Sequence, residues 1–84
     1  MQKFELSIHA AEQIQIRGIS REIVFDVVSH PDKVEELVDG QFIYQKVVRF
    51  PDSFDYLVRV FVNSNKIPNL IKTVYRTTKF SKYE

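Results

Sequence analysis

The sequence has no cysteine and no tryptophan, and only two glycines, three prolines and two histidines among its 84 residues. Without cysteine it cannot form disulfides, use thiolate chemistry or bind a metal through sulfur. Two histidines without the HExxH spacing do not predict a zinc site. No apolar run reaches the 18 residues of a transmembrane helix, and the N-terminus lacks the apolar stretch of a secretory signal. We therefore expect one cytoplasmic domain over residues 1–84, away from membranes and without a cofactor.

The formal net charge of +1 hides an uneven distribution of charge along the chain. Residues 21–40 hold six carboxylates and two cations, whereas residues 64–84 hold five cations and one carboxylate. Aromatic residues are interleaved with the C-terminal cations, as expected of a surface that binds a phosphate backbone and its bases. A solvated edge strand whose lysines prevent edge-to-edge pairing is the structural alternative.

Two helices are expected at the start of the fold. The first covers about residues 8–17 after an N-cap at Ser7, and the second covers about residues 21–29 after an N-cap at Ser20. Pro31 ends the second helix, because the residue before a proline avoids the helical region.

Four strands follow, since the apolar period then changes. They are expected at Lys33–Val38, Gln41–Phe50, Phe54–Val62 and Leu70–Thr77. Asp39-Gly40 predicts a type I′ hairpin turn. The third strand is apolar on both faces, which places it centrally in the sheet. The expected fold class is α+β, with two N-terminal helices packed on a mainly antiparallel sheet of about four strands, in the order ααββββ.

The first helix carries a polar stripe along one border of its apolar arc. The arc comprises Ile8, Ala10, Ala11 and Ile14, and the stripe comprises His9, Gln13 and Arg17. A neutral imidazole is the usual general acid or base near pH 7, so His9 is a candidate catalytic residue. A half-buried histidine that only packs or caps is the structural alternative.

Arg59 stands in the middle of the most apolar expected strand, between Val58 and Val60. A guanidinium in that position must be paired or must line a cleft, because burying it alone is costly. An ion pair with Asp55, two residues earlier on the same face, is one interpretation. The functional interpretation is an electrophile that binds a phosphate through its planar fork.

The last strand combines hydroxyls with cations. Thr73, Tyr75 and Thr77 should face one side of the sheet, and Lys72, Val74 and Arg76 the other. Such residues can bind a phosphate or protonate a leaving oxygen, although they are also ordinary strand residues. RNA supplies its own nucleophile, the 2′-OH, so a base, a cation and an acid suffice to cleave it without a metal.

The segment from His9 to Ile19, His-Ala-Ala-Glu-Gln-Ile-Gln-Ile-Arg-Gly-Ile, resembles the motif HAxxRxxxRGI. That motif opens a bacterial domain-of-unknown-function family that is common in cyanobacteria. The likeness continues in order through Pro31–Val34, Arg59–Val62 and Lys72–Lys79. The family is grouped with the barnase–EndoU–colicin–RelE superfamily of ribonuclease toxins.

This resemblance implies a RelE-like fold and a metal-independent endoribonuclease toxin of a type II toxin–antitoxin system. The implied partners are RNA, as mRNA either free or on the ribosome, and a small cognate antitoxin that binds the last strand and residues 80–83. The catalytic residues would be His9, Arg59, Tyr75 and Thr77. The substrate-binding residues would be Gln13, Arg17, Thr73, Arg76, Lys79 and Lys82. Gln13 replaces the first arginine of the motif, which removes a charge that could bind phosphate.

Two alternatives are compatible with the same residues. One is a non-catalytic module that binds RNA or a protein through the basic C-terminal face, in which Lys79 and Lys82 matter more than His9. The other is a ParE-like toxin that acts on a protein target and needs no histidine.

Overall fold

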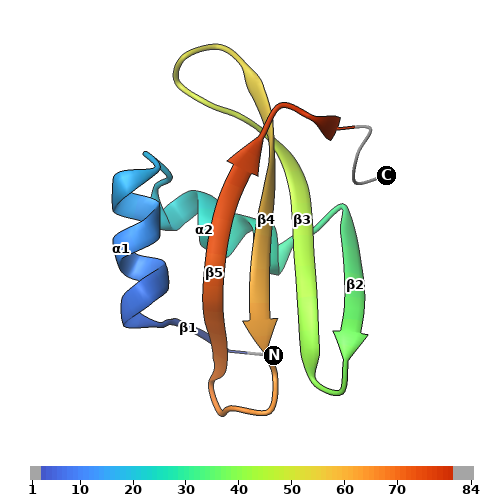
Figure 1. Cartoon of the computed structure of the whole chain (residues 1–84). Coiled ribbons are helices and arrows are strands. Elements are labelled where there is room, and N and C mark those ends of the chain that lie inside the picture. The colour runs from blue at the N-terminus through green and yellow to red at the C-terminus, as the bar shows by residue number, and fades with distance from the viewer. Residues whose placement is uncertain (1–2, 81–84) are drawn as a thin grey trace.

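The computed structural model describes residues 3–80, which form two helices and a five-stranded sheet (Figure 1). The elements in chain order are β1 (Phe4–Leu6), α1 (Ile8–Ile16), α2 (Arg21–Ser29), β2 (Lys33–Val38), β3 (Gln41–Arg49), β4 (Asp55–Asn63) and β5 (Asn69–Thr77). The α+β class and the position of both helices before the four long strands are confirmed. The sheet has five strands rather than four, because a short strand precedes α1.

The strands are ordered β1-β5-β4-β3-β2 across the sheet. The three pairings among the long strands are antiparallel, whereas β1 runs parallel to β5, with Phe4 opposite Asn69 and Leu6 opposite Ile71. The central place predicted for β4 is confirmed. The sequence did not predict β1, because three residues are too few to show an alternating pattern of apolar and polar side chains. Its presence places β5 inside the sheet.

Both helices begin at the serines expected to cap them. Ser7 Oγ accepts a hydrogen bond from the Ala10 amide at 3.0 Å, and Ser20 Oγ accepts one from the Ile23 amide at 3.2 Å. These bonds satisfy backbone donors that have no partner within a helix. The apolar arc of α1 is narrower than expected, because Ile8 is exposed and the buried positions are Ala10 and Ile14.

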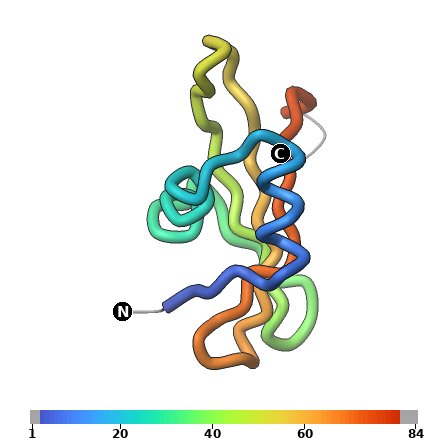
Figure 2. Tube along the Cα trace, turned by 90° about the vertical axis from the view of Figure 1, so that its left-hand side faces the viewer, coloured from blue at the N-terminus to red at the C-terminus, as the bar shows by residue number. Residues whose placement is uncertain are grey.

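The two helices lie on different parts of the sheet (Figures 1 and 2). α2 crosses one face, and α1 runs alongside β5. The core between the helices and this covered face includes Val24, Val27 and Val28 of α2 with Val58, Val60 and Val62 of β4. Side chains alternate along a strand, so the residues between these valines point to the other side.

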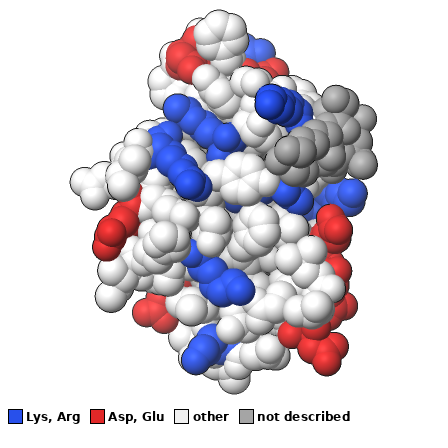
Figure 3. All heavy atoms as spheres, viewed as in Figure 1, with Lys and Arg blue, Asp and Glu red and all other residues white. Residues whose placement is uncertain are grey.

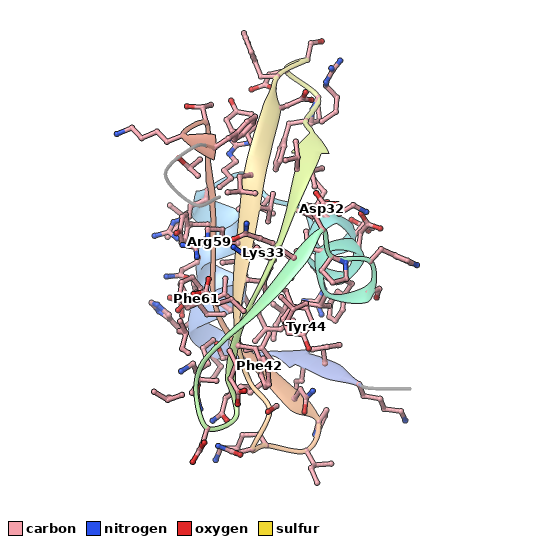
Figure 4. All side chains as sticks on the ribbon, turned by 90° about the vertical axis from the view of Figure 1, so that its right-hand side faces the viewer. Asp32, Lys33, Phe42, Tyr44, Arg59 and Phe61 are labelled. Atoms are coloured by element: carbon pink, nitrogen blue, oxygen red, sulfur yellow. The ribbon has the colours of Figure 1, made fainter. Side chains whose placement is uncertain are left out.

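The opposite face of the sheet carries no helix from residues 3–80, and we call it the open face (Figure 4). Arg59 and Phe61 lie on this side, whereas Tyr44 lies on the side of α2. The register of the strands identifies the residues of the neighbouring strands that share this side with Arg59 and Phe61. The open face thus includes Lys33 and Glu35 of β2, Ile43, Gln45 and Val47 of β3, Leu57, Arg59 and Phe61 of β4, and Thr73, Tyr75 and Thr77 of β5.

The β2–β3 turn at Asp39-Gly40 is a hairpin, but it is not of type I′. A type I′ turn requires positive φ at both central residues, and here only Gly40, with φ of +75°, has it. The strand register shifts between Glu36 and Val38, which changes how β2 enters the turn. Asn65 packs against Gly40 where a Cβ would stand, and its Nδ2 donates to the carbonyl of Asp39 at 3.3 Å. The turn is therefore tied to the β4–β5 loop.

Candidate functional site on the open sheet face

Arg59 occupies the centre of the open face and is only 8% exposed. Its Nε donates to Gln45 Oε1 at 3.2 Å, and its Nη1 donates to the Tyr75 hydroxyl at 2.6 Å. Its Cζ lies 5.6 Å from the centroid of the Phe61 ring and 5.8 Å from that of Tyr75. The side chain is thus fixed by partners on three adjacent strands.

The ion pair considered between Arg59 and Asp55 is not formed. Asp55 Oδ1 instead accepts from Arg49 Nε at 2.6 Å, across the β3–β4 pair. That hydrogen bond is the main reason why the pKa of the Asp55 carboxyl is lowered. Arg59 is oriented by an amide and a phenol instead.

Tyr75 stands directly opposite Arg59 in the β4–β5 ladder. Thr73 and Thr77 share its face, opposite Phe61 and Leu57, as the alternation of the last strand predicts. The structure therefore brings together four of the predicted site residues, namely Arg59, Thr73, Tyr75 and Thr77.

Gln13 and Arg17 bind the backbone of β5. Gln13 Oε1 accepts from the Val74 amide at 3.0 Å, and Arg17 Nη1 donates to the Val74 carbonyl at 2.6 Å. β1 pairs with β5 only as far as Ile71, so both side chains satisfy backbone groups that have no strand beside them. Sequence reasoning missed this role, because an i, i+4 polar pair on a helix does not reveal which strand lies beside it.

His9 is linked to the same place through Gln13. The Nε2 atoms of His9 and Gln13 lie 2.8 Å apart. Because Gln13 Oε1 accepts from the Val74 amide, its Nε2 is the donor, and His9 Nε2 is the unprotonated acceptor. Within residues 3–80, His9 makes no hydrogen bond to Arg59. The structure therefore places His9 at the β5 edge and Arg59 on the open face.

The remaining predicted substrate-binding residues do not share one surface. Arg76 points to the covered face, where its Cζ lies 4.5 Å from the ring centroids of both Phe50 and Tyr56. Lys79 is exposed just after β5. Lys82 lies outside the described residues. The predicted set is thus divided between the open face, the β5 edge and the covered face.

A small polar cluster accompanies Arg76. The Tyr56 hydroxyl donates to Asp52 Oδ2 at 2.7 Å. This hydrogen bond is the main cause of the lowered pKa of Asp52 and of the raised pKa of Tyr56. The cluster, together with the two rings, accounts for the position of Arg76 in structural terms.

Over residues 3–80, no group of three or more histidine, aspartate and glutamate side chains is placed to hold a metal ion. The helices described in this range are all too short to cross a membrane.

No protein-family model, no curated protein and no solved structure matches the chain. The resemblance to ribonuclease toxins therefore stays a prediction, which rests on the motif from His9 to Ile19 and on the ordered segments after it.

Proposed function

We propose that the open face binds RNA and cleaves it without a metal, as an endoribonuclease toxin with a small antitoxin as its partner. The observation that carries the proposal is the 2.6 Å hydrogen bond between Arg59 and Tyr75 at the centre of the open face. A cation and a phenol are joined there, with the hydroxyls of Thr73 and Thr77 on the same strand.

The chemistry assigns one role to each group. The 2′-oxygen attacks phosphorus and the bond to the 5′-oxygen breaks, which leaves a 2′,3′-cyclic phosphate and a 5′-hydroxyl. Arg59 stabilises the charge that develops on the phosphorane. Tyr75 protonates the leaving 5′-oxygen, because its hydroxyl is held beside the guanidinium that would bind the phosphate.

His9 is the proposed base for the 2′-OH proton. Of the two histidines, it is the one beside β5, whereas His30 follows α2 and lies with its Nδ1 3.5 Å from Asp26 Oδ1. His9 Nε2 already carries the lone pair that a base needs. It must exchange the Gln13 amide for the RNA hydroxyl when substrate binds.

The surroundings of the Arg59–Tyr75 pair suit a single-stranded nucleic acid. The rings of Phe61 and Tyr75 lie 6.0 Å apart at an interplanar angle of 32°, which gives bases an aromatic surface on which to stack. Lys and Arg side chains gather over the upper half of this side of the molecule (Figure 3). They would attract the phosphate backbone in a salt-dependent way.

The test is cleavage of an end-labelled mRNA in excess EDTA by wild type and by Tyr75→Phe. We expect the wild type to leave 2′,3′-cyclic ends, and the variant to be slower by about 100-fold or more, the usual contribution of a general acid. Tyr56→Phe is the matched control, because it also removes a hydrogen-bonded hydroxyl but lies away from the open face. Absence of cleavage by folded wild type, or equal rates for both variants, would contradict the proposal.

A non-catalytic RNA-binding module is the second candidate. It is favoured by the hydrogen bond that occupies His9 Nε2 and by the structural use of Gln13 and Arg17 at the β5 edge. It predicts salt-sensitive RNA binding without products, weakened by Lys79→Ala and unchanged by His9→Ala. Growth arrest that survives His9→Ala, with intact RNA, would instead indicate a protein target.

A further inference from the structure

β2 forms the edge of the sheet on the side away from β1. All of its six residues are exposed, and no strand of residues 3–80 pairs with its outer side. An edge strand of this kind presents alternate N–H and C=O groups to an incoming chain. Six residues are also enough to pair with another strand over a useful length.

Three apolar side chains are exposed along this edge. Val34 is 44% exposed, Leu37 is 50% exposed and Val38 is 65% exposed. At the same end of the sheet, the β4–β5 loop exposes Ile67 at 98%, and this loop is tied to the β2–β3 turn by the Asn65 hydrogen bond (Figure 1). Exposed apolar side chains along an unpaired edge are typical of a protein interaction site.

The charges along the same edge have one predominant sign. Residues 32–39 include four carboxylates (Asp32, Glu35, Glu36 and Asp39) and a single cation, Lys33. Acidic side chains mark the right-hand side of the molecule where β2 lies (Figure 3). This charge repels nucleic acid and favours a cationic protein segment.

We propose that β2 is the docking edge for an extended segment of a partner protein, in which basic and apolar residues alternate and which adds to the sheet as a further strand. Backbone hydrogen bonds to β2 would hold the segment, and the cations along one of its faces would meet Glu35, which shares a face with Ile43. The same charges exclude a second copy of this chain, because pairing β2 with β2 would bring four glutamates together.

This docking edge is distinct from the Arg59–Tyr75 centre of the RNA-cleaving surface proposed above. A strand added to β2 extends the sheet in its own plane, whereas Arg59 and Tyr75 stand on the open face beyond β3. The proposal about β2 therefore holds or fails independently of any ribonuclease activity.

The experiment uses the whole chain labelled with ¹⁵N and a probe peptide of four Lys-Val repeats. We expect amide shift changes concentrated at residues 33–38. The charge-reversed variant Glu35→Lys/Glu36→Lys should bind the peptide at least 10-fold more weakly. The matched control is Glu12→Lys/Glu22→Lys, which makes the same change of net charge on the exposed surfaces of the two helices.

A second peptide separates strand addition from simple charge attraction. It has the same sequence with every backbone nitrogen methylated, so it keeps its charge and can donate no backbone hydrogen bond along either edge. We expect it to lose binding. Equal binding of both peptides, equal weakening by the control variant, shift changes on another surface or a wild-type dimer paired through β2 would each overturn the proposal.

Discussion

The two edges of the sheet differ in the partners of their backbone N–H and C=O groups. At one edge β1 covers the first part of β5, and α1 takes over where β1 stops, through Gln13 and Arg17 at Val74. At the other edge β2 stands exposed along its whole length and carries exposed apolar side chains. The backbone of the first edge is satisfied within the chain, whereas the second edge has no partner strand among residues 3–80.

This difference shows how side chains can replace a strand. A helix has no free backbone groups along its length, so it cannot continue a β-ladder. An amide and a guanidinium on successive turns can, because one accepts from a backbone N–H and the other donates to the C=O of the same residue. Gln13 and Arg17, which the sequence suggested as substrate-binding residues, thereby hold α1 against β5.

The largest effect on stability is expected from removing Gln13 and Arg17, the two side chains that replace a strand beside Val74. Gln13→Leu/Arg17→Leu leaves the N–H and C=O of Val74 without their partners, which should lower the free energy of unfolding by about 2–4 kcal/mol. Urea denaturation followed by circular dichroism measures this change.

The control for that variant is Gln15→Leu/Arg21→Leu, which removes an exposed glutamine and an exposed arginine from the two helices. It should change stability by less than about 0.5 kcal/mol. If both double variants are equally stable, the contacts at Val74 contribute nothing and the two edges differ only in appearance.

A smaller effect is expected from Gln13→Arg, which restores the motif residue. Arginine has no acceptor, so it cannot replace Gln13 Oε1 at the Val74 amide, and we expect a loss of about 1–2 kcal/mol. Gln13→Glu keeps an acceptor there and should remain closer to wild type. Amide hydrogen exchange at Val74 reads the difference directly. Equal protection in both variants would show that the acceptor at position 13 is dispensable.

The smallest effect is expected on the β2 side, where α2 is fastened to β3 by an exposed ion pair. Asp26 Oδ2 lies 2.8 Å from Lys46 Nζ, and this hydrogen bond is the main cause of the lowered pKa of Asp26. A folded-state pKa below the ordinary 3.8 contributes stability above pH 3.8 that is lost as the pH falls through the lowered value. Because both groups are partly exposed, we expect Asp26→Asn to cost about 0.5 kcal/mol or less at pH 7.

Urea titrations of wild type and Asp26→Asn at pH 7 and pH 3 measure this contribution. The difference in stability between the two proteins should be smaller at the lower pH, because the contribution of the ionised carboxyl is lost as the pH falls through its lowered pKa. A difference that is larger at pH 3 than at pH 7 would contradict the assignment.

Most of the fold could be predicted because its signals are local. Ser7 and Ser20 cap helices through bonds three residues away, and the change of apolar period after Pro31 marks the start of the sheet. β1 could not be predicted, since its three residues owe their conformation to a partner strand more than 60 residues later. Pairing with a distant strand produces no recognisable alternation of apolar and polar residues in so short a segment.

The candidate site was predictable only in part. Alternation along β5 correctly places Thr73 and Tyr75 on one face, and Tyr75 stands opposite Arg59. The division between His9 at the edge and Arg59 on the open face was not predictable, because spacing along a helix does not say on which side of a neighbouring strand it lies. Arg76 lies on the face opposite Tyr75, as the alternation predicts, but its packing against Phe50 and Tyr56 was not predictable, since these rings lie on other parts of the chain.

The parallel pairing of β1 with β5 also determines when β1 can join the sheet during synthesis and folding. Phe4 pairs with Asn69, and Gln13 accepts a hydrogen bond from Val74, so β1 and α1 reach their final places only after β5 has been synthesised. Contacts between such distant residues slow folding, because a long loop must close before they form. A nascent chain that lacks β5 leaves β4 with one unpaired side, and the last strand to emerge completes the sheet.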